Sequence, residues 1–205
     1  SAVRTPMGSF SGAFSLVPAT KLGSIVIAEA LKRIQLSTDR VDDVYMGCVL
    51  SAGLGQAPAR QASIGAGIPN SVGATTVNKV CGSSLKTLIM AVQAIVLGEA
   101  RIIVAGGMES MNGAPYMLPR ARFGYRLGDG TIVDSTVHDA LWCAVEECHV
   151  GTHAERTAIA RQISREDQDE FALRSHMNAV AAMDAGRFDA ELAPVTVLDA
   201  KGRET

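Results

Sequence analysis

Residues 75–97, TTVNKVCGSSLKTLIMAVQAIVL, place a β-prone run directly before a helical one. Thr75–Val80 is rich in β-branched residues and predicts a strand, and residues 83–97 carry apolar side chains at a helical period. We expect these apolar side chains to form the buried face of a rigid helix: Leu85, Leu88, Ile89, Val92, Ile95 and Val96. Cys81 then lies in a turn between a strand and a helix.

The same alternation continues toward the amino terminus and beyond the helix. Strands are predicted over Val44–Leu50 and Arg101–Ala105, and helices over Lys21–Leu36 and Gln56–Gly65. Helices that alternate with strands in this way are typical of α/β proteins with a mostly parallel sheet. The sequence therefore predicts an α/β layered domain.

The pattern changes after Gly107. Residues 108–133 contain prolines and glycines without periodicity and predict a long functional loop. Three helices and a strand should follow: a short helix around 139–145, one from Thr152 with a capping box to Glu155, one from Ser164 that Gly186 can end, and a strand over 194–198. Residues 1–6 resemble the tail of a strand, so we expect both ends to be interruptions of a longer chain.

Composition excludes several classes of protein. With 205 residues, 47% of them hydrophobic and 20% charged, the chain should form one large globular domain, or one and a fraction. Its 19 basic residues are scattered among 21 acidic ones, which argues against a nucleic-acid groove. We expect no membrane span and no export signal, so the cytosol is the default compartment, with an organelle matrix as the alternative. The four cysteines lack metal-ligand spacing and predict reduced thiols and no metal site.

Cys81 is the candidate nucleophile. Unpaired N–H groups and the positive end of the helix dipole favour a thiolate at a helix amino terminus. Gly82 permits close approach of the backbone, and the Cys81 N–H could stabilise an oxyanion at a carbonyl attacked by the sulfur. The alternative is that Cys81 is a small buried hydrophobic residue.

Two blocks of sequence resemble the signature of the thiolase family: Asn78-Lys-Val-Cys-Gly-Ser-Ser-Leu-Lys86 and Gly106-Gly-Met-Glu-Ser-Met111. Arg4-Thr-Pro6, residues 53–62 and His149–Glu155 are similar to thiolases in the same order. The resemblance spans essentially the whole chain but covers only about the first half of a thiolase. It implies a layered α/β/α/β/α fold, in which residues 1–110 form the amino-terminal α/β domain with a truncated first strand. Residues 111–205 would then belong to an inserted loop domain, incomplete at its carboxyl end.

The resemblance implies an acetyl-CoA C-acetyltransferase that forms or cleaves 3-ketoacyl-CoA through an acyl group on Cys81. CoA thioesters would be substrates, and no cofactor would be bound permanently. The full-length protein would be a homodimer or homotetramer of lipid metabolism. In thiolases a His, a second Cys and an Asn come from the second half, which is absent here, so we expect this chain alone to be inactive.

The resemblance also implies roles for residues outside the Cys81 turn. His149 and Leu141 would contact CoA, although a capping or surface role for His149 and a helix-core role for Leu141 remain open. Gln56 and Arg60, with Gly82, would support the nucleophile loop, or the first two would belong to a surface helix cap. Residues 117–133 would lie in a loop used for tetramer contacts or form a solvated basic loop. None of His138, His153 and His176 matches the family's catalytic His motif.

Two alternatives to a working thiolase remain. The chain could be a catalytically incomplete fragment that associates or binds CoA without turnover, or part of a related condensing enzyme such as a β-ketoacyl synthase. Half of a layered fold would expose the apolar face meant for its other half, so we expect the isolated chain to self-associate.

Overall fold

The computed structural model describes residues 1–197 of the chain, which divide into two compact units. The sheet unit comprises Ser1–Ala140 and the segment that begins at Ala193, and the hairpin unit comprises Leu141–Leu192. A domain boundary at residue 110, as the family resemblance implies, stays a prediction.

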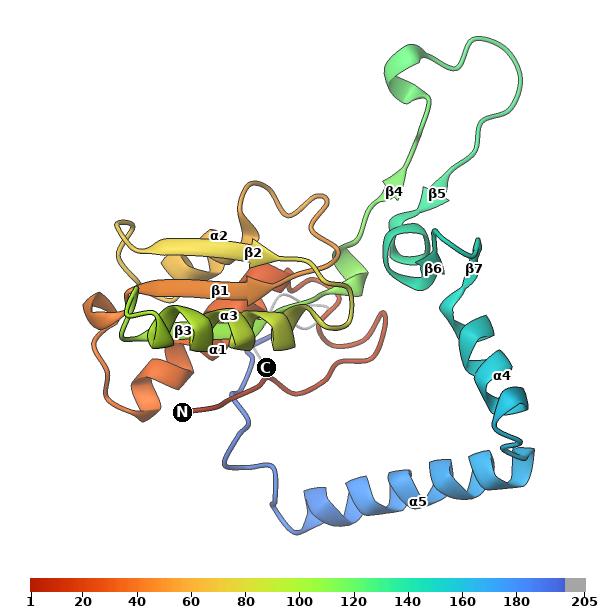
Figure 1. The fold of residues 1–205 in the computed structure, drawn as a ribbon. Helices are drawn as coiled ribbons and strands as arrows, with labels where there is room; N and C mark the ends of the chain where they lie inside the picture. Colours follow the sequence, from red (N-terminus) through yellow and green to blue (C-terminus); the bar gives the residue numbers. More distant parts are fainter. Residues whose placement is uncertain (198–205) are drawn as a thin grey trace. The chain divides into compact units, whose positions relative to one another are not determined.

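A three-stranded parallel sheet forms the centre of the sheet unit (Figure 1). Its order is β2-β1-β3, with β1 at Asp43–Gly47, β2 at Gly73–Val77 and β3 at Ile103–Gly107. The predicted parallel α/β arrangement is thus confirmed, although the strand ends differ from prediction by up to three residues. Gly47 is in register with Val77 on one side and Gly107 on the other, so the three strands end at one edge of the sheet.

The main hydrophobic core lies between the sheet and two helices, α1 (Ala19–Arg33) and α2 (Pro58–Gly65). Both helices are shorter than predicted, and α2 begins at Pro58 because proline fits the first turn of a helix. The core is built from apolar side chains of α1, β1 and α2, namely Ile27, Leu31, Val44, Met46, Ala59 and Ala62, with others from the adjoining loops.

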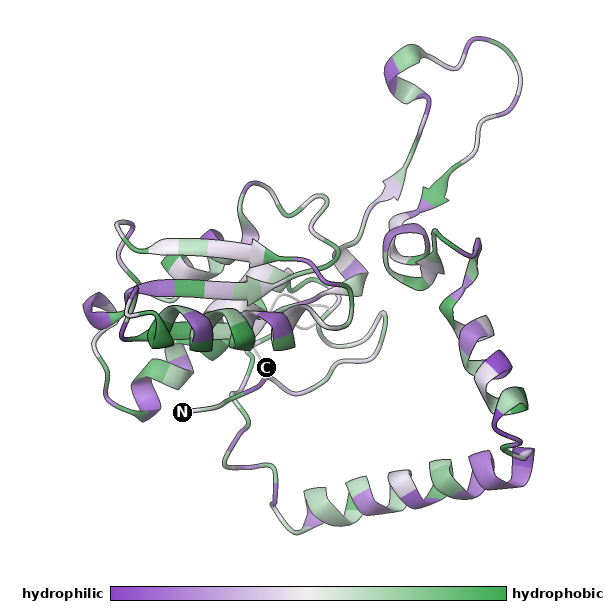
Figure 2. Ribbon diagram, viewed as in Figure 1, coloured by the Kyte–Doolittle hydropathy of each residue, from purple (hydrophilic) through white to green (hydrophobic). Residues whose placement is uncertain are grey.

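Helix α3 (Ser83–Val96) packs against the three strands with the opposite face from the one predicted. Its buried residues are the small Ser83, Thr87, Ala91 and Ala94. The apolar side chains that the periodicity assigned to the core are exposed: Leu85, Leu88, Ile89, Val92, Ile95 and Val96. The predicted burial is therefore wrong for this chain, and the hydrophobic residues along α3 are visible in Figure 2. Periodicity identifies an apolar face but does not show which neighbour covers it.

Asp42 joins the beginnings of β1 and β3. Its carboxylate accepts the N–H groups of Ile102 (2.9 Å) and Arg101 (2.8 Å), and its own N–H donates to the Ile102 carbonyl (2.9 Å). These backbone hydrogen bonds, that of Ile102 first, hold the pKa of Asp42 below its usual value. The carboxylate therefore keeps both hydrogen bonds at neutral pH.

The segment after β3 is largely irregular, as predicted. Strands β4 (Tyr116–Met117) and β5 (Val133–Asp134) pair in antiparallel fashion, and a π-helical turn follows at Thr136–Leu141. The short 3₁₀ helices of the sheet unit are Thr38–Arg40, Met111–Gly113 and Ala121–Phe123. Of residues 1–6, only Arg4 takes part in a β-bridge, and its carbonyl accepts the Ala193 N–H at 2.8 Å.

The hairpin unit contains strands β6 (Trp142–Cys143) and β7 (Cys148–His149), followed by helices α4 (Val150–Ala160) and α5 (Arg165–Asp184). The hairpin replaces the second part of the helix predicted around 139–145. The described helices include none that is long and apolar enough to cross a membrane.

Helix ends in the hairpin unit test two predictions, and residues 194–197 of the sheet unit test a third. The capping box predicted at Thr152 is wrong, because α4 begins earlier and His149 caps it. The helix from Ser164 is confirmed: Ser164 forms a capping box with Asp167, and Gly186 has a left-handed φ of 63° just beyond the helix. Further along, residues 194–197 of the strand predicted over 194–198 form no strand, and residue 198 lies outside the described residues.

Candidate active site

Cys81 lies in the loop between β2 and α3, and its side chain is exposed. The exposure rules out the alternative that Cys81 is a buried hydrophobic residue. Gly82 occupies the cap position of α3, where its carbonyl accepts the Lys86 N–H at 2.9 Å. The sulfur is thus carried by the residue just before a helix amino terminus, where the helix dipole favours negative charge.

Two polar side chains hold this turn in shape. Ser83 Oγ accepts the Lys79 N–H at 2.8 Å and donates to the Val80 carbonyl at 2.5 Å, and Asn78 Oδ1 accepts the Val80 N–H at 3.0 Å. Val80 has a φ of 48°, a conformation that is unusual for a β-branched residue. Such strain persists only where surrounding contacts enforce it, and here the hydrogen bonds of Asn78 and Ser83 hold Val80, the residue before Cys81.

Glycine at the end of β1 lets α3 approach the sheet. A Cβ on Gly47 would lie 2.8 Å from both Ser83 Cβ and the Ser84 nitrogen. On the next strand, the Gly106 carbonyl accepts a hydrogen bond from Thr87 Oγ1 at 2.9 Å. Sequence reasoning missed Gly47, although a glycine at the end of a buried strand is a recognised sign of close backbone approach.

The turn already uses two of the N–H groups nearest to Cys81. The Gly82 N–H donates to the Lys79 carbonyl and the Ser83 N–H to the Val80 carbonyl, both at 3.1 Å. Neither is therefore available to an incoming oxyanion while the turn persists. The Cys81 N–H stays the predicted oxyanion donor.

Cys48, which follows β1, is buried and chemically unlike Cys81. Burial, followed by the negative charge of Glu109, raises the pKa of Cys48 to about 12. The Glu109 carboxylate accepts the N–H groups of Val49 (2.8 Å) and Leu50 (3.1 Å) and lies 3.7 Å from the Cys48 sulfur. Glu109 thus fixes the chain after β1, a structural role that sequence reasoning did not assign.

A cavity of about 170 Å³ in the sheet unit brings together two of the sequence blocks that resemble thiolases. Arg4 and Thr5 line it from the amino-terminal block, and Gly107, Met108 and Glu109 line it from the block after β3. The two blocks are about a hundred positions apart in the sequence but adjoin in the fold.

Gln56 and Arg60 lie before and within α2. The exposed Gln56 accepts the Gln61 side-chain amide on its carbonyl at 2.7 Å. Arg60 donates to the carbonyls of Asn70 (2.8 Å) and Val72 (3.4 Å), just before β2 begins. Because Cys81 follows the other end of β2, support of the nucleophile loop by these two residues stays a prediction.

The residues predicted to contact CoA lie in the hairpin unit. Leu141 is half-buried, and the exposed His149 caps α4 by accepting the Gly151 N–H on Nδ1 at 3.0 Å. His149 therefore has the capping role that was the alternative to CoA contact. With Nδ1 used as an acceptor, the ring proton of neutral His149 lies on Nε2, where it can donate to a ligand.

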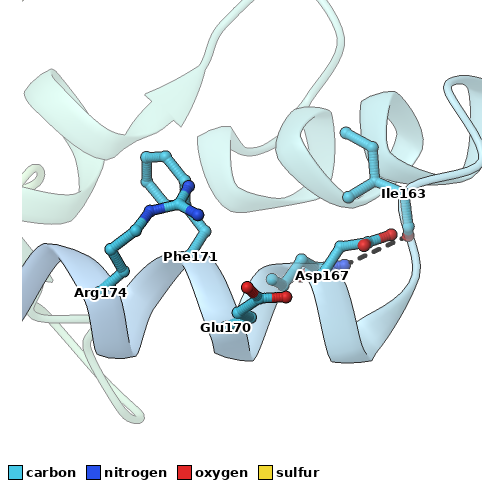
Figure 3. A pocket seen from close by; sticks show the side chains of 6 residues that line it. Ile163, Asp167, Glu170, Phe171 and Arg174 are labelled. Carbon is cyan, nitrogen blue, oxygen red and sulfur yellow. Dashed lines mark hydrogen bonds between the residues drawn. The ribbon is translucent and has the colours of Figure 1, made fainter.

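The hairpin unit also contains a cluster of possible metal ligands and a hollow on α5. Glu146, Cys148 and His153 can bring one ligand atom each within 4.8 Å of one another, although Arg156 already lies 2.6 Å from a Glu146 oxygen. A hollow on α5, shown in Figure 3, is lined by Ile163, Asp167, Gln168, Glu170, Phe171 and Arg174. The Arg174 guanidinium lies 5.5 Å from the centre of the Phe171 ring. We assign the hollow no chemistry, because one helix and its entry loop supply all of its lining.

Comparison with known proteins decides the family. The whole chain, residues 1–205, matches the family described as "Thiolase, N-terminal domain". The chain belongs to the thiolase family. It is 52% identical to acetyl-CoA acetyltransferase 2 of Arabidopsis thaliana over 200 residues, and 50% identical to an acetyl-CoA acetyltransferase of Escherichia coli over 202 residues. An acetyl-CoA acetyltransferase of Cupriavidus necator is 48% identical over 202 residues.

Each of these alignments includes 98% of this chain but only 50% or 51% of the relative. The thiolase chain described here therefore spans about half the length of the curated relatives it matches. The resemblance inferred from the Cys81 and Gly106 blocks is confirmed at the level of the family.

Proposed function

We propose that the full-length protein containing this thiolase domain is an acetyl-CoA C-acetyltransferase with Cys81 as its nucleophile. The observation that carries the proposal is the exposed Cys81, held before α3 by Ser83 and Asn78. Relatives named acetyl-CoA acetyltransferase that align with almost the whole chain support the choice of substrate class.

The chemistry is acyl transfer through a thioester on the enzyme. The Cys81 thiolate attacks the thioester carbonyl of an acyl-CoA, the carbon–sulfur bond to CoA breaks, and CoA leaves as a thiol after it takes up a proton. The carbanion that a second acyl-CoA forms by losing a proton then attacks the acyl group. Cys81 is released as a thiolate, and the product is a 3-ketoacyl-CoA. In reverse, Cys81 attacks the keto carbon of a 3-ketoacyl-CoA, the bond to the adjacent carbon breaks, and that carbon takes up a proton to give an acyl-CoA. A CoA thiolate then attacks the acyl group on Cys81 and releases the cysteine.

His149 and Leu141 are proposed to bind CoA. An exposed His149 Nε2–H can donate to a polar group of the nucleotide, and the half-buried Leu141 offers apolar contact. The partner His, second Cys and Asn are proposed to come from the rest of the protein, as is assembly into a dimer or tetramer. On this proposal the chain alone does not turn over.

Intact mass of the full-length protein after incubation with acetyl-CoA tests the role of Cys81. We expect a net gain of about 42 Da, as one acetyl group replaces the thiol hydrogen, that is absent in Cys81→Ala and retained in Cys48→Ala. An acetyl group that survives in Cys81→Ala would refute the assignment. Acylation by an acyl-carrier-protein thioester but not by acetyl-CoA would favour a β-ketoacyl synthase instead.

A second measurement addresses the CoA contacts. Replacing His149 by Ala should raise KM for acetyl-CoA, with a smaller effect on kcat, if the side chain binds CoA equally in the ground and transition states. Because His149 also caps α4, His149→Asn is the informative comparison: asparagine is a good helix cap, so it restores the helix but not the imidazole contact.

A further inference from the structure

Two cysteines outside the Cys81 site face each other in the hairpin unit. Strands β6 and β7, adjacent in Figure 1, are antiparallel, and Cys143 is the direct partner of Cys148 in their register. Directly opposed residues of an antiparallel pair have Cα atoms about 4.5 to 5.5 Å apart and side chains on the same face. A disulfide requires Cα atoms about 4.4 to 6.8 Å apart, and directly opposed residues meet this requirement.

The hairpin holds the two thiols in this arrangement. Four residues, 144–147, connect the strands, and Glu147 closes the loop with a left-handed φ of 50°. The Glu146 N–H donates to Cys143 Sγ at 3.5 Å. Both cysteines are free and only half-buried, so small reagents can reach them.

A histidine and a carboxylate stand beside Cys148. His153 Nε2 lies 3.6 Å from Cys148 Sγ, and His153 Nδ1 lies 3.6 Å from Glu146 Oε2. A nucleophile beside a base that a third group orients is the arrangement that activates a thiol. His153 can take the Cys148 proton, and the Glu146 carboxylate then faces the resulting imidazolium.

We propose that Cys148 is a second reactive thiol of this protein, oxidised by hydroperoxides and resolved by Cys143 to form a disulfide across the hairpin. The Cys148 thiolate attacks the hydroperoxide, the oxygen–oxygen bond breaks, and an alcohol, or water from hydrogen peroxide, leaves. The Cys143 sulfur then attacks the Cys148 sulfenic acid and releases water. Two thiols are oxidised and one hydroperoxide is reduced. The inference does not rest on the proposed acyl transfer.

The same side chains could instead bind a metal ion, but the geometry favours the thiol pair. His153 turns Nε2 toward Cys148 and Nδ1 toward Glu146, so its closest contacts with these two groups use different ring nitrogens. Arg156 also lies 2.6 Å from the same Glu146 oxygen and opposes a cation there.

Peptide mapping of the full-length protein gives a direct test. Trypsin should release residues 127–156 as one peptide that contains Cys143 and Cys148 and no other cysteine, whereas Cys81 lies in the separate peptide 80–86. After exposure to hydrogen peroxide, we expect peptide 127–156 to lose about 2 Da and to resist alkylation. Reduction should restore both the original mass and the alkylation of the two thiols. Retention of two free thiols at doses that oxidise Cys81 would overturn the proposal, and so would a zinc ion bound to these thiols in the purified protein.

Single variants distinguish the roles of the three side chains. In Cys143→Ser, the Cys148 sulfenic acid should persist and be trapped by dimedone, whereas Cys148→Ser should give little sulfenic acid at Cys143. His153→Gln should slow disulfide formation at least about tenfold. His138→Gln, a matched change of an exposed histidine in the sheet unit, should leave the rate unchanged. Equal rates for the two histidine variants would remove His153 from the reaction, and preferential trapping at Cys143 would reverse the assignment of the thiols.

Discussion

Replacing Gly47 by Ala should displace the amino terminus of α3 and, with it, Cys81. The new Cβ would lie 2.8 Å from Ser83 Cβ and from the Ser84 nitrogen, and 2.9 Å from the Ser83 carbonyl carbon. These are backbone and Cβ atoms, so no side-chain rotation relieves the overlap. An ordinary contact of about 3.4 Å requires α3 and the sheet to separate locally by about 0.6 Å.

The expected cost follows from this separation. Overpacking of this kind destabilises a core by about 1 to 3 kcal/mol, which urea denaturation of the full-length protein can measure. A misplacement of 1 Å at a catalytic group can cost about 10²-fold in rate, so a shift near 0.6 Å should slow acetylation of Cys81 by about tenfold. Mass spectrometry at timed intervals after addition of acetyl-CoA gives this rate.

Gly106→Ala is the matched control. Gly106 lies in the neighbouring strand, and a Cβ there would meet only Met46 Sδ, at an ordinary 3.7 Å. We expect Gly106→Ala to keep the wild-type acetylation rate and to lose much less stability. A stable Gly47→Ala protein acetylated as fast as wild type would refute the argument that close approach of α3 positions the nucleophile.

Other variants test further contacts. The folded state keeps Cys48 protonated up to a pKa of about 12, whereas the unfolded chain loses this proton near the ordinary thiol pKa of about 8.5. The contribution of Cys48 to stability is therefore complete below about pH 8.5 and is lost as pH rises toward 12. Between pH 8 and 10 the wild type should therefore lose about 1 to 2 kcal/mol more unfolding free energy than Cys48→Ala, measured by urea denaturation at each pH. Ser83→Ala should cost about 1 to 3 kcal/mol and slow Cys81 acetylation, because it removes the hydroxyl that is hydrogen-bonded to the Lys79 N–H and the Val80 carbonyl. The exposed Ser84→Ala should change stability by less than about 0.5 kcal/mol. The 205-residue chain produced alone should self-associate in sedimentation velocity, and the double variant Leu88→Glu, Val92→Lys should associate less. Equal association of the two proteins would argue against the exposed face of α3 as the cause.

The sequence predicted the parallel sheet and the place of Cys81, since both depend on local patterns. A run of β-branched residues followed by a helical period indicates a strand followed by a helix. Where strands and helices alternate, each helix connects two strands that run parallel to each other. Cys81 lies between such a strand and helix, so its position before α3 followed from the boundary alone. Its exposure could not be predicted, because burial depends on neighbours from elsewhere in the chain.

The errors arose where tertiary contacts decide between local alternatives. The apolar residues of α3 follow a helical period, but α3 packs closely over Gly47 with the face that carries its small residues, including Ser83 and Thr87. At α4, Thr152 and Glu155 fit a capping box, yet the β6–β7 hairpin brings His149 into position three residues earlier. Neither outcome follows from the helical period or the capping motif alone, because both depend on contacts with other segments of the chain.

The Asp42 carboxylate determines the alignment of strands that no hairpin connects. A slip of one residue between β1 and β3 would break its two hydrogen bonds to the Arg101 and Ile102 N–H groups. The same slip would bring a residue with a side chain to the place of Gly47, beneath the first turn of α3, and turn alternate side chains to the wrong face. The placement of Cys81 is therefore set partly from the far end of the sheet, by the exposed carboxylate of Asp42.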